Sequence, residues 1–548
     1  MPPKRKSAAS SNASPRKRRR ADTTDSDSDD GEVHQFGAAT KDDERDARAF
    51  STAATTATRA TRSLPFTGPC PPLSSFAIRV AAGAISKLYT GKRAERTKTQ
   101  LLRVPDHVVP RLFAQLRALH PTLLNNTIIS TYFLRGNEVV LTGDLPGVSA
   151  ATIAAIPRLG SPATLHTLEL SGLQAKTLSD DAAAKVLKQL PALEKLVLRD
   201  SKGVGHLAVT SAAKHCQRLR FVNLNYTQAT ADSVTLLISS CPHLTTLKLA
   251  AVLPLNKSGL KPLLALAKHA VTNTQLVAGQ NIVNLKLRSL TITPEPAYRA
   301  LLSFFPNLRR LDLSHTNVHF NDALVGDVPP ALEKLAINHT PTTGAELCEV
   351  LGRFTHLRTL NIAALGAGKG TPGMHSTTMF ALTPQVLRVV TNTLAGFENL
   401  ENLSLAASAR LTAHEVVYED QLSAFQDFLA RVGRRCKFLD LSNISDLKSR
   451  DLSTLVGDED APPPALEHLL LSGCTKIDDD AAVFIASCVN LRVLELESTS
   501  IRSEGVFQIL DRCQKLESID LTGCRGVRIH DRRRIFEAWE ADRGAGSG

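Results

Sequence analysis

The sequence predicts an α/β solenoid in which each repeat supplies one strand and one helix. Three segments near the C-terminus follow the pattern L-x-x-L-x-L, with Ile519 in place of the second leucine in the last one, and they begin 25 residues apart at Leu466, Leu491 and Leu516. A fixed period of this length with this spacing of leucines is the signature of a leucine-rich repeat. The 548 residues exceed one ordinary globular core, but each repeat of a solenoid packs only on its neighbours. We therefore expect a right-handed horseshoe with parallel strands inside and helices outside.

Degenerate copies of the pattern extend this solenoid over residues 135–528. A first strand is expected in GNEVVLTGDL, from Gly136. Helical stretches follow many strands, and those from Asp180 and Asp478 begin with carboxylates that can cap free N–H groups. The remaining predicted strands open at Leu165, Leu193, Leu219, Leu244, Leu287, Leu308, Leu332, Leu357, Leu400, Cys436, Leu466, Leu491 and Leu516.

Residues 1–70 are predicted to be a disordered tail, because they contain almost no large apolar side chains. Eight Lys and Arg and no acidic residue occur among the first 20 residues. The two clusters resemble a bipartite nuclear localisation signal, which makes importin a partner and the nucleus the expected location. The same charges could also contact DNA without sequence preference. The residues concerned are Lys4, Arg5, Lys6, Arg16, Lys17, Arg18, Arg19 and Arg20.

Three side chains beside these clusters are candidate phosphorylation sites. Ser14 precedes Pro15, and Thr24 and Ser26 each have an acidic residue three positions further on. A phosphate would place about two negative charges close to the basic clusters. We therefore expect phosphorylation to regulate import.

Residues 71–134 are predicted to form a small helical domain that covers the first repeat. A first helix is indicated by apolar residues spaced three and four apart, namely Leu73, Phe76, Val80, Ala84 and Leu88. A second helix follows the start signals Pro105 and Asp106, and a third begins at Pro121. The apolar face of the second helix consists of Val108, Leu112, Leu116 and Leu119.

Residues 529–548 are expected to form a C-terminal capping helix and tail. Ile535, Phe536 and Trp539 are the apolar side chains that could cover the last repeat. No run of about 18 apolar residues is present, so no membrane partner is expected.

No motif in the sequence predicts catalysis, a cofactor or a metal. Gly368 and Lys369 lack the remaining residues of a phosphate-binding loop. None of the nine cysteines forms a C-x-x-C pair, and we expect reduced thiols. Four of the cysteines precede the first leucine of a strand by three residues, which favours packing in the same buried position of successive coils. These four are Cys216, Cys241, Cys488 and Cys513.

Candidate binding residues lie at the third, fifth and seventh positions of L-x-x-L-x-L-x. Side chains of a strand alternate between faces, so these positions point to the concave side, where a protein substrate is expected. The concave face should run from basic in early coils to acidic in late coils. The candidates are Lys195, Arg199 and Lys248, followed by Asp440, Glu495, Glu497 and Asp520.

The repeats resemble those of a known class. ISSCPHLTTLKL, LSGCTKIDDDAAVFIASCVNLRVLEL and RCQKLESIDLTGCRGV resemble the cysteine-containing, RNI-like leucine-rich repeats of F-box-type proteins, over roughly residues 160–528. This resemblance implies a non-catalytic substrate-recognition subunit of a nuclear cullin–RING ubiquitin ligase. A nuclear scaffold or chromatin-associated binding protein without a ligase is the alternative.

The segment before the repeats also resembles adaptor-binding regions. VPDHVVPRLFAQLRAL is loosely similar to the start of an F-box. Leu73–Leu134 is more similar to the elongin-C-binding segment of other leucine-rich receptors, including the fungal nucleotide-excision-repair receptor. The resemblance implies elongin C or a Skp-type adaptor and a cullin as partners, with a link to DNA repair. The adaptor-binding candidates are Leu73, Ala77, Val108 and Leu112, with Ala77 standing where that segment has Cys.

Overall fold

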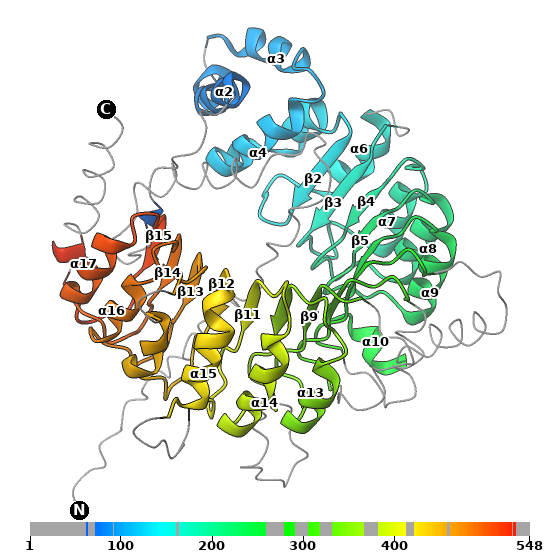
Figure 1. Cartoon of the computed structure of the whole chain (residues 1–548). Coiled ribbons are helices and arrows are strands. Elements are labelled where there is room, and N and C mark those ends of the chain that lie inside the picture. Colours follow the sequence, from blue (N-terminus) through cyan, green and yellow to red (C-terminus); the bar gives the residue numbers. More distant parts are fainter. Residues whose placement is uncertain are drawn as a thin grey trace, which may run out of the picture.

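A computed structural model describes residues 62–63, 72–90, 92–159, 164–258, 279–290, 305–317, 331–366, 382–412, 421–457, 461–528 and 530–532. Strands and helices alternate along this part of the chain. The strands line the inside of an open horseshoe and the helices form its outside (Figure 1). The predicted α/β leucine-rich-repeat solenoid is confirmed.

Fourteen strands form one parallel sheet in sequence order. Most of them have three residues, and neighbouring strands pair so that the central leucine of one lies beside the central apolar residue of the next. The strands are β2 (Glu138–Thr142), β3 (Thr167–Ser171), β4 (Lys195–Val197), β5 (Phe221–Asn223), β6 (Thr246–Lys248), β7 (Asn284–Lys286), β8 (Arg310–Asp312), β9 (Lys334–Ala336), β10 (Thr359–Asn361), β11 (Asn402–Ser404), β12 (Phe438–Asp440), β13 (His468–Leu470), β14 (Val493–Glu495) and β15 (Ser518–Asp520).

Helices cover the outer side of this sheet. Several of these helices have a serine or threonine as N-cap, whose hydroxyl accepts a hydrogen bond from a backbone N–H of the first turn. These N-cap residues are Ser179, Thr230, Thr343, Thr383 and Ser423. The outer helices are α6 (Ala150–Leu159), α7 (Asp180–Leu187), α8 (His206–His215), α9 (Ala231–Ser240), α10 (Leu253–Ser258), α13 (Gly344–Leu351), α14 (Pro384–Ala395), α15 (Ala424–Arg431), η4 (Gly433–Arg435), η5 (Ser449–Leu455), α16 (Ala481–Ala486) and α17 (Ser503–Arg512).

Both carboxylates predicted to cap helices also connect neighbouring coils. Asp478 accepts a 3.3 Å hydrogen bond from the Asp480 N–H just before α16, as predicted, whereas Asp180 caps the next helix and not its own. Ser179 caps α7, while Asp180 accepts hydrogen bonds of 2.8–2.9 Å from three backbone N–H groups at the start of α8. Asp478 accepts a 2.6 Å hydrogen bond from the Ser449 hydroxyl of the preceding coil, and α16 begins only at Ala481. A carboxylate between stacked coils stabilises the N-terminus of a neighbour as well as its own.

One predicted strand has the wrong register. The coil expected to open at Leu287 opens at Ile282, and β7 covers Asn284–Lys286. Ile282, Leu285 and Leu287 are buried and occupy the three leucine positions of the repeat. Because isoleucine replaces the first leucine, a search for leucine alone shifts the strand by five residues.

A left-handed turn follows the strands of most coils. In this turn the backbone N–H of Tyr226, for example, donates to the carbonyl of Ala250 in the next coil at 2.8 Å. This hydrogen bond between coils holds ordinary residues at a positive φ that usually requires glycine. Residues with this conformation are Asp200, Tyr226, Ala251, Ser289, His315, His339, Ala364, Ala407, Asn443 and Ser498.

A helical segment precedes the solenoid and lies beyond β2 (Figure 1). It contains α2 (Leu73–Thr90), α3 (Ala94–Leu102), α4 (Val109–Leu119), η2 (Pro121–Leu123), α5 (Asn126–Ile128) and η3 (Ile129–Phe133). The third predicted helix is therefore broken into short turns. The rings of Phe113 and Phe133 stack at 5.1 Å, and the buried side chains of this segment join those of the solenoid in one continuous core.

The last strand has its own partners at the other end of the sheet. A two-residue strand, β1 (Arg62–Ser63), pairs antiparallel with β15, although it belongs to the tail predicted to lack structure. This pairing satisfies backbone groups that the edge of a sheet otherwise leaves exposed. Arg532 donates to the carbonyls of Cys524 and Val527, at 2.8 and 3.1 Å. The predicted capping residues Ile535, Phe536 and Trp539 lie outside the described residues.

Candidate functional site: the concave face and helix α2

The concave face of the sheet carries the residues predicted to bind a protein substrate. Leucines on each strand point into the core, and the side chains between them point to the inner side. The register places Lys195 beside Phe221, Lys248 beside Lys286, and Glu495 beside Asp520. Single residues of separate coils thus become continuous rows.

The inner face from β4 to β9, here called the basic arc, is rich in cations. Lys286 lies 3.9 Å from the carboxylate of Asp312, the one acidic side chain at the third, fifth or seventh position of these described coils. The cations at these positions are Lys195, Arg199, Lys248, Lys286, Arg288, Arg310 and Lys334. Arg310 and Lys334 could have been found by applying the position rule to every coil. Lys286 and Arg288 were hidden by the error in register.

Phe221 forms the centre of the basic arc. The ammonium groups of Lys195 and Lys248 both lie 5.3 Å from the centroid of its ring. Lys248 is only 6% exposed, so its aliphatic chain is packed while its charge stays beside the ring. The aromatic ring attracts both cations and holds them on one small area of the sheet. The sequence pattern did not identify Phe221, since an aromatic residue at this position also fits simple packing.

The inner face from β12 to β15, here called the acidic arc, has the opposite charge. Its acidic residues are Asp440, Glu495, Glu497 and Asp520, and no Lys or Arg occurs at the third, fifth or seventh positions of these described coils. Burial raises the pKa of Glu495, and the nearby carboxylates, Asp520 first, raise it further. The concave face is therefore basic from β4 to β9 and acidic from β12 to β15, and the first two strands, β2 and β3, carry the carboxylates Glu138 and Glu169 beside Lys195.

Ion pairs border the concave face along one rim. Arg309 contacts Glu333 at 2.8 Å and Lys437 contacts Glu401 at 3.0 Å. Arg492 lies 3.7 Å from carboxylates of both neighbouring coils. Exposed pairs of this kind each contribute little stability. Their charges largely cancel, so the rim does not share the polarity of the two arcs.

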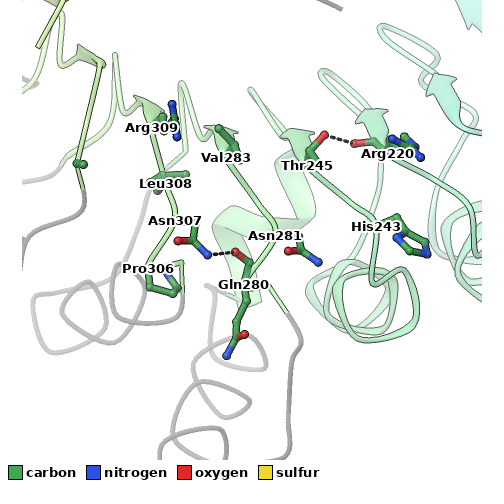
Figure 2. A pocket seen from close by; sticks show the side chains of 11 residues that line it. Arg220, His243, Thr245, Gln280, Asn281, Val283, Pro306, Asn307, Leu308 and Arg309 are labelled. Atoms are coloured by element: carbon green, nitrogen blue, oxygen red, sulfur yellow. Dashed lines mark hydrogen bonds between the residues drawn. The ribbon is translucent and has the colours of Figure 1, made fainter. Parts of the chain in front are cut away.

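A groove of about 570 Å³ lies along the same rim between Arg220 and Arg309 (Figure 2). Several of its polar side chains bind backbone carbonyls of neighbouring coils. Asn307 donates to the carbonyl of Gln280 at 2.9 Å, and the Thr245 hydroxyl donates to the carbonyl of Arg220 at 3.0 Å. We therefore assign the groove to the packing between coils.

A second candidate surface lies on α2. Leu73, Phe76 and Val80 are 83%, 41% and 71% exposed, and with the exposed Ala77 they form one strip, here called the α2 ridge. These are residues of the apolar stripe that predicted the helix. The helix is confirmed, but its buried side consists of Ile78, Ala82 and Ile85 instead.

The four adaptor-binding candidates are divided by the structure. Leu73 and Ala77 lie on the α2 ridge. Val108 is partly buried just before α4, and Leu112 is buried in the core. The hydrogen bond from Arg111 to the Ser75 hydroxyl, at 2.6 Å, fixes α2 against α4. A partner can reach the ridge without disturbing that contact.

The described cysteines are free thiols that are buried except for the half-buried Cys348. Burial raises the pKa of Cys216 and Cys488 to about 12, and that of Cys241 and Cys513 to about 11. Sulfur atoms also donate to backbone carbonyls, as from Cys513 to Cys488 at 3.5 Å. Thiols in such positions are poor nucleophiles. They fill space between coils.

Other predicted residues lie outside the described part of the chain. These are the import clusters and the candidate phosphorylation sites Ser14, Thr24 and Ser26. Within the described ranges, no group of three His, Cys, Asp or Glu could hold a metal ion. None of the described helices is long and apolar enough to cross a membrane.

Comparisons with known proteins add the following. Neither protein-family models nor curated proteins gave a match. Among solved structures, an internalin from Listeria monocytogenes is 15% identical, with a TM-score of 0.37 over 81% of this chain and 94% of its own. The Rad7 and Elc1 complex of yeast matches at 17% identity and a TM-score of 0.46, covering 78% of this chain and 93% of that one.

Proposed function

We propose that this protein is a non-catalytic substrate-recognition subunit of a nuclear cullin–RING ubiquitin ligase. Its concave face would bind the substrate and its α2 ridge would bind the adaptor. The resemblance of the repeats and of Leu73–Leu134 to ligase receptors supports this proposal, and it connects the role with DNA repair. The basic tail supports location in the nucleus.

The α2 ridge is the observation that carries the proposal. Leu73, Phe76, Ala77 and Val80 give an apolar strip on a helix that is already fixed to its own domain by Ile78 and Ile85. Large apolar side chains gathered on an exposed helix are typical of a surface that a partner covers. The strip lies on the helical segment, away from the basic arc, so that an adaptor and a substrate could bind together (Figure 1).

The test is direct binding of the full chain to purified elongin C and to a purified Skp-type adaptor, measured by isothermal titration calorimetry. We expect one of them to bind wild type. The Leu73→Asp/Val80→Asp variant should bind that adaptor at least about 100-fold more weakly, because two apolar contacts of roughly 1.5–3 kcal/mol each are lost.

The matched control carries the same substitutions at two other exposed apolar helix positions, Leu207 on α8 and Val483 on α16. This control should bind the adaptor like wild type. If neither adaptor binds, and no cullin is retained on the full chain, the ligase role is rejected. The remaining interpretation is then a nuclear scaffold or chromatin-associated binding protein.

A further inference from the structure

We infer that the basic arc binds an acidic segment of a partner protein, whose carboxylates or phosphates contact the ammonium groups of Lys195 and Lys248 on either side of Phe221. This inference rests on the proposed use of the concave face, and it adds the chemical class of the partner. Three features of the described residues support it.

The first feature is the charge of the arc. Seven cations occupy the inner positions from β4 to β9, against the single carboxylate of Asp312. Charges of one sign that line a concave surface add their potentials and raise the local concentration of oppositely charged groups. A partner that crosses these coils therefore gains most from acidic side chains.

The second feature is the packed centre around Phe221. Two ammonium groups lie 5.3 Å from the same ring centroid, and Lys248 is largely buried. The two cations repel one another, and an anionic group that contacts both across the edge of the ring would offset this repulsion. Because Lys248 and Phe221 are held by the surrounding coils, little side-chain entropy is lost on binding. This centre is the expected anchor of the interface.

The third feature separates a protein partner from a nucleic acid. A continuous polyanion that followed the concave face would meet Asp440, Glu495, Glu497 and Asp520 in the acidic arc. Phosphate groups would be repelled there. A protein can carry acidic groups opposite β4 to β9 and basic groups opposite β12 to β15, so the polarity of the face favours a protein.

The experiment measures binding of the full chain to three fluorescent probes by anisotropy. The probes are a 15-residue peptide rich in Asp and Glu, a peptide of the same length whose only charged side chains are several phosphoserines, and a 15-nucleotide oligothymidine. We expect the peptides to bind more tightly than the oligonucleotide, with affinity that falls as salt is added. Tighter binding of the phosphopeptide would identify phosphate as the preferred anion, and tighter binding of the acidic peptide would identify carboxylate.

The test variant is Lys195→Met/Lys248→Met, which keeps the apolar length of both side chains and removes both charges. We expect it to bind the preferred peptide at least about tenfold more weakly than wild type. The matched control, Lys188→Met/Lys214→Met, changes net charge equally at exposed positions on the outer side, directly after α7 and in α8. Its affinity should stay within about twofold of wild type, and circular dichroism checks that each variant is folded.

Equal affinity of wild type and Lys195→Met/Lys248→Met would overturn the inference. The inference would also be overturned if the control lost affinity equally. It would be overturned as well if the oligonucleotide bound more tightly than both peptides. Adaptor binding is measured on the same proteins and should not change. Failure of adaptor binding would reject the ligase role and leave the peptide result standing, so the two proposals fail separately.

Discussion

The coils from β12 to β15 and the helical segment from α2 to α4 use apolar residues in different ways. In the coils, Leu469, Leu494 and Ile519 occupy the same position of successive strands, and all are fully buried. In α2, Leu73 and Val80 are exposed although their spacing alone suggested a buried face. The same residue types at regular spacing are therefore structural in one region and available to a partner in the other.

The reason is the number of ways in which each region can pack. A coil stacks between two similar coils, so its leucines have one direction to point. Helix α2 carries two apolar stripes, and contacts with its neighbours decide which one is buried. Exposed apolar residues that no repeat explains are the better indication of function.

The largest expected effect is a difference in stability between two variants, in which one leucine of the coils or one leucine of α2 is exchanged for alanine. Leu494→Ala removes a fully buried side chain and should lower the free energy of unfolding by about 2–5 kcal/mol. Leu73→Ala should change it by no more than about 0.5 kcal/mol. Urea unfolding followed by circular dichroism measures both, and similar losses would contradict the difference between the two regions.

A smaller effect is expected for the cysteines that fill the coils. Cys488 is fully buried, and its thiol packs as a small apolar group. Cys488→Ser should destabilise the protein by about 1–3 kcal/mol because a buried hydroxyl replaces the thiol, and Cys488→Ala should cost less. Thermal unfolding distinguishes them. A serine variant more stable than the alanine variant would show that this position is polar.

The smallest effect concerns pH and the acidic arc. Since burial and the nearby carboxylates raise the pKa of Glu495 in the folded state, the unfolded chain loses this proton first as pH rises. The free energy of unfolding therefore falls from the ordinary pKa of 4.5 up to the raised value. Glu495→Gln should remove this decrease and be more stable than wild type at pH 7.

Urea unfolding at pH 4 and pH 7 measures this gain. The control is Glu504→Gln, at an exposed carboxylate on α17. An equal gain in the control would assign the effect to net charge and not to the acidic arc.

The repeat region shows how far sequence reasoning extends. The strands opening at Leu466, Leu491 and Leu516 were predicted in the correct register because all three open with leucine and keep the same spacing of apolar residues. The coil at Ile282 was misread, since one isoleucine was enough to hide its first position. Capping by Asp180 was also misread, because a hydrogen bond to the next coil depends on how coils stack.

The sequence by itself determined the solenoid, the direction of strand residues in every coil with a correctly read register, and the contrast in charge between the basic and the acidic arc. These follow from period and alternation, which are properties of the chain. Only the tertiary structure decided that Phe221 lies between two ammonium groups, that Leu112 is buried and that Leu73 is exposed. These depend on which surfaces meet across coils and helices, and no local spacing specifies that.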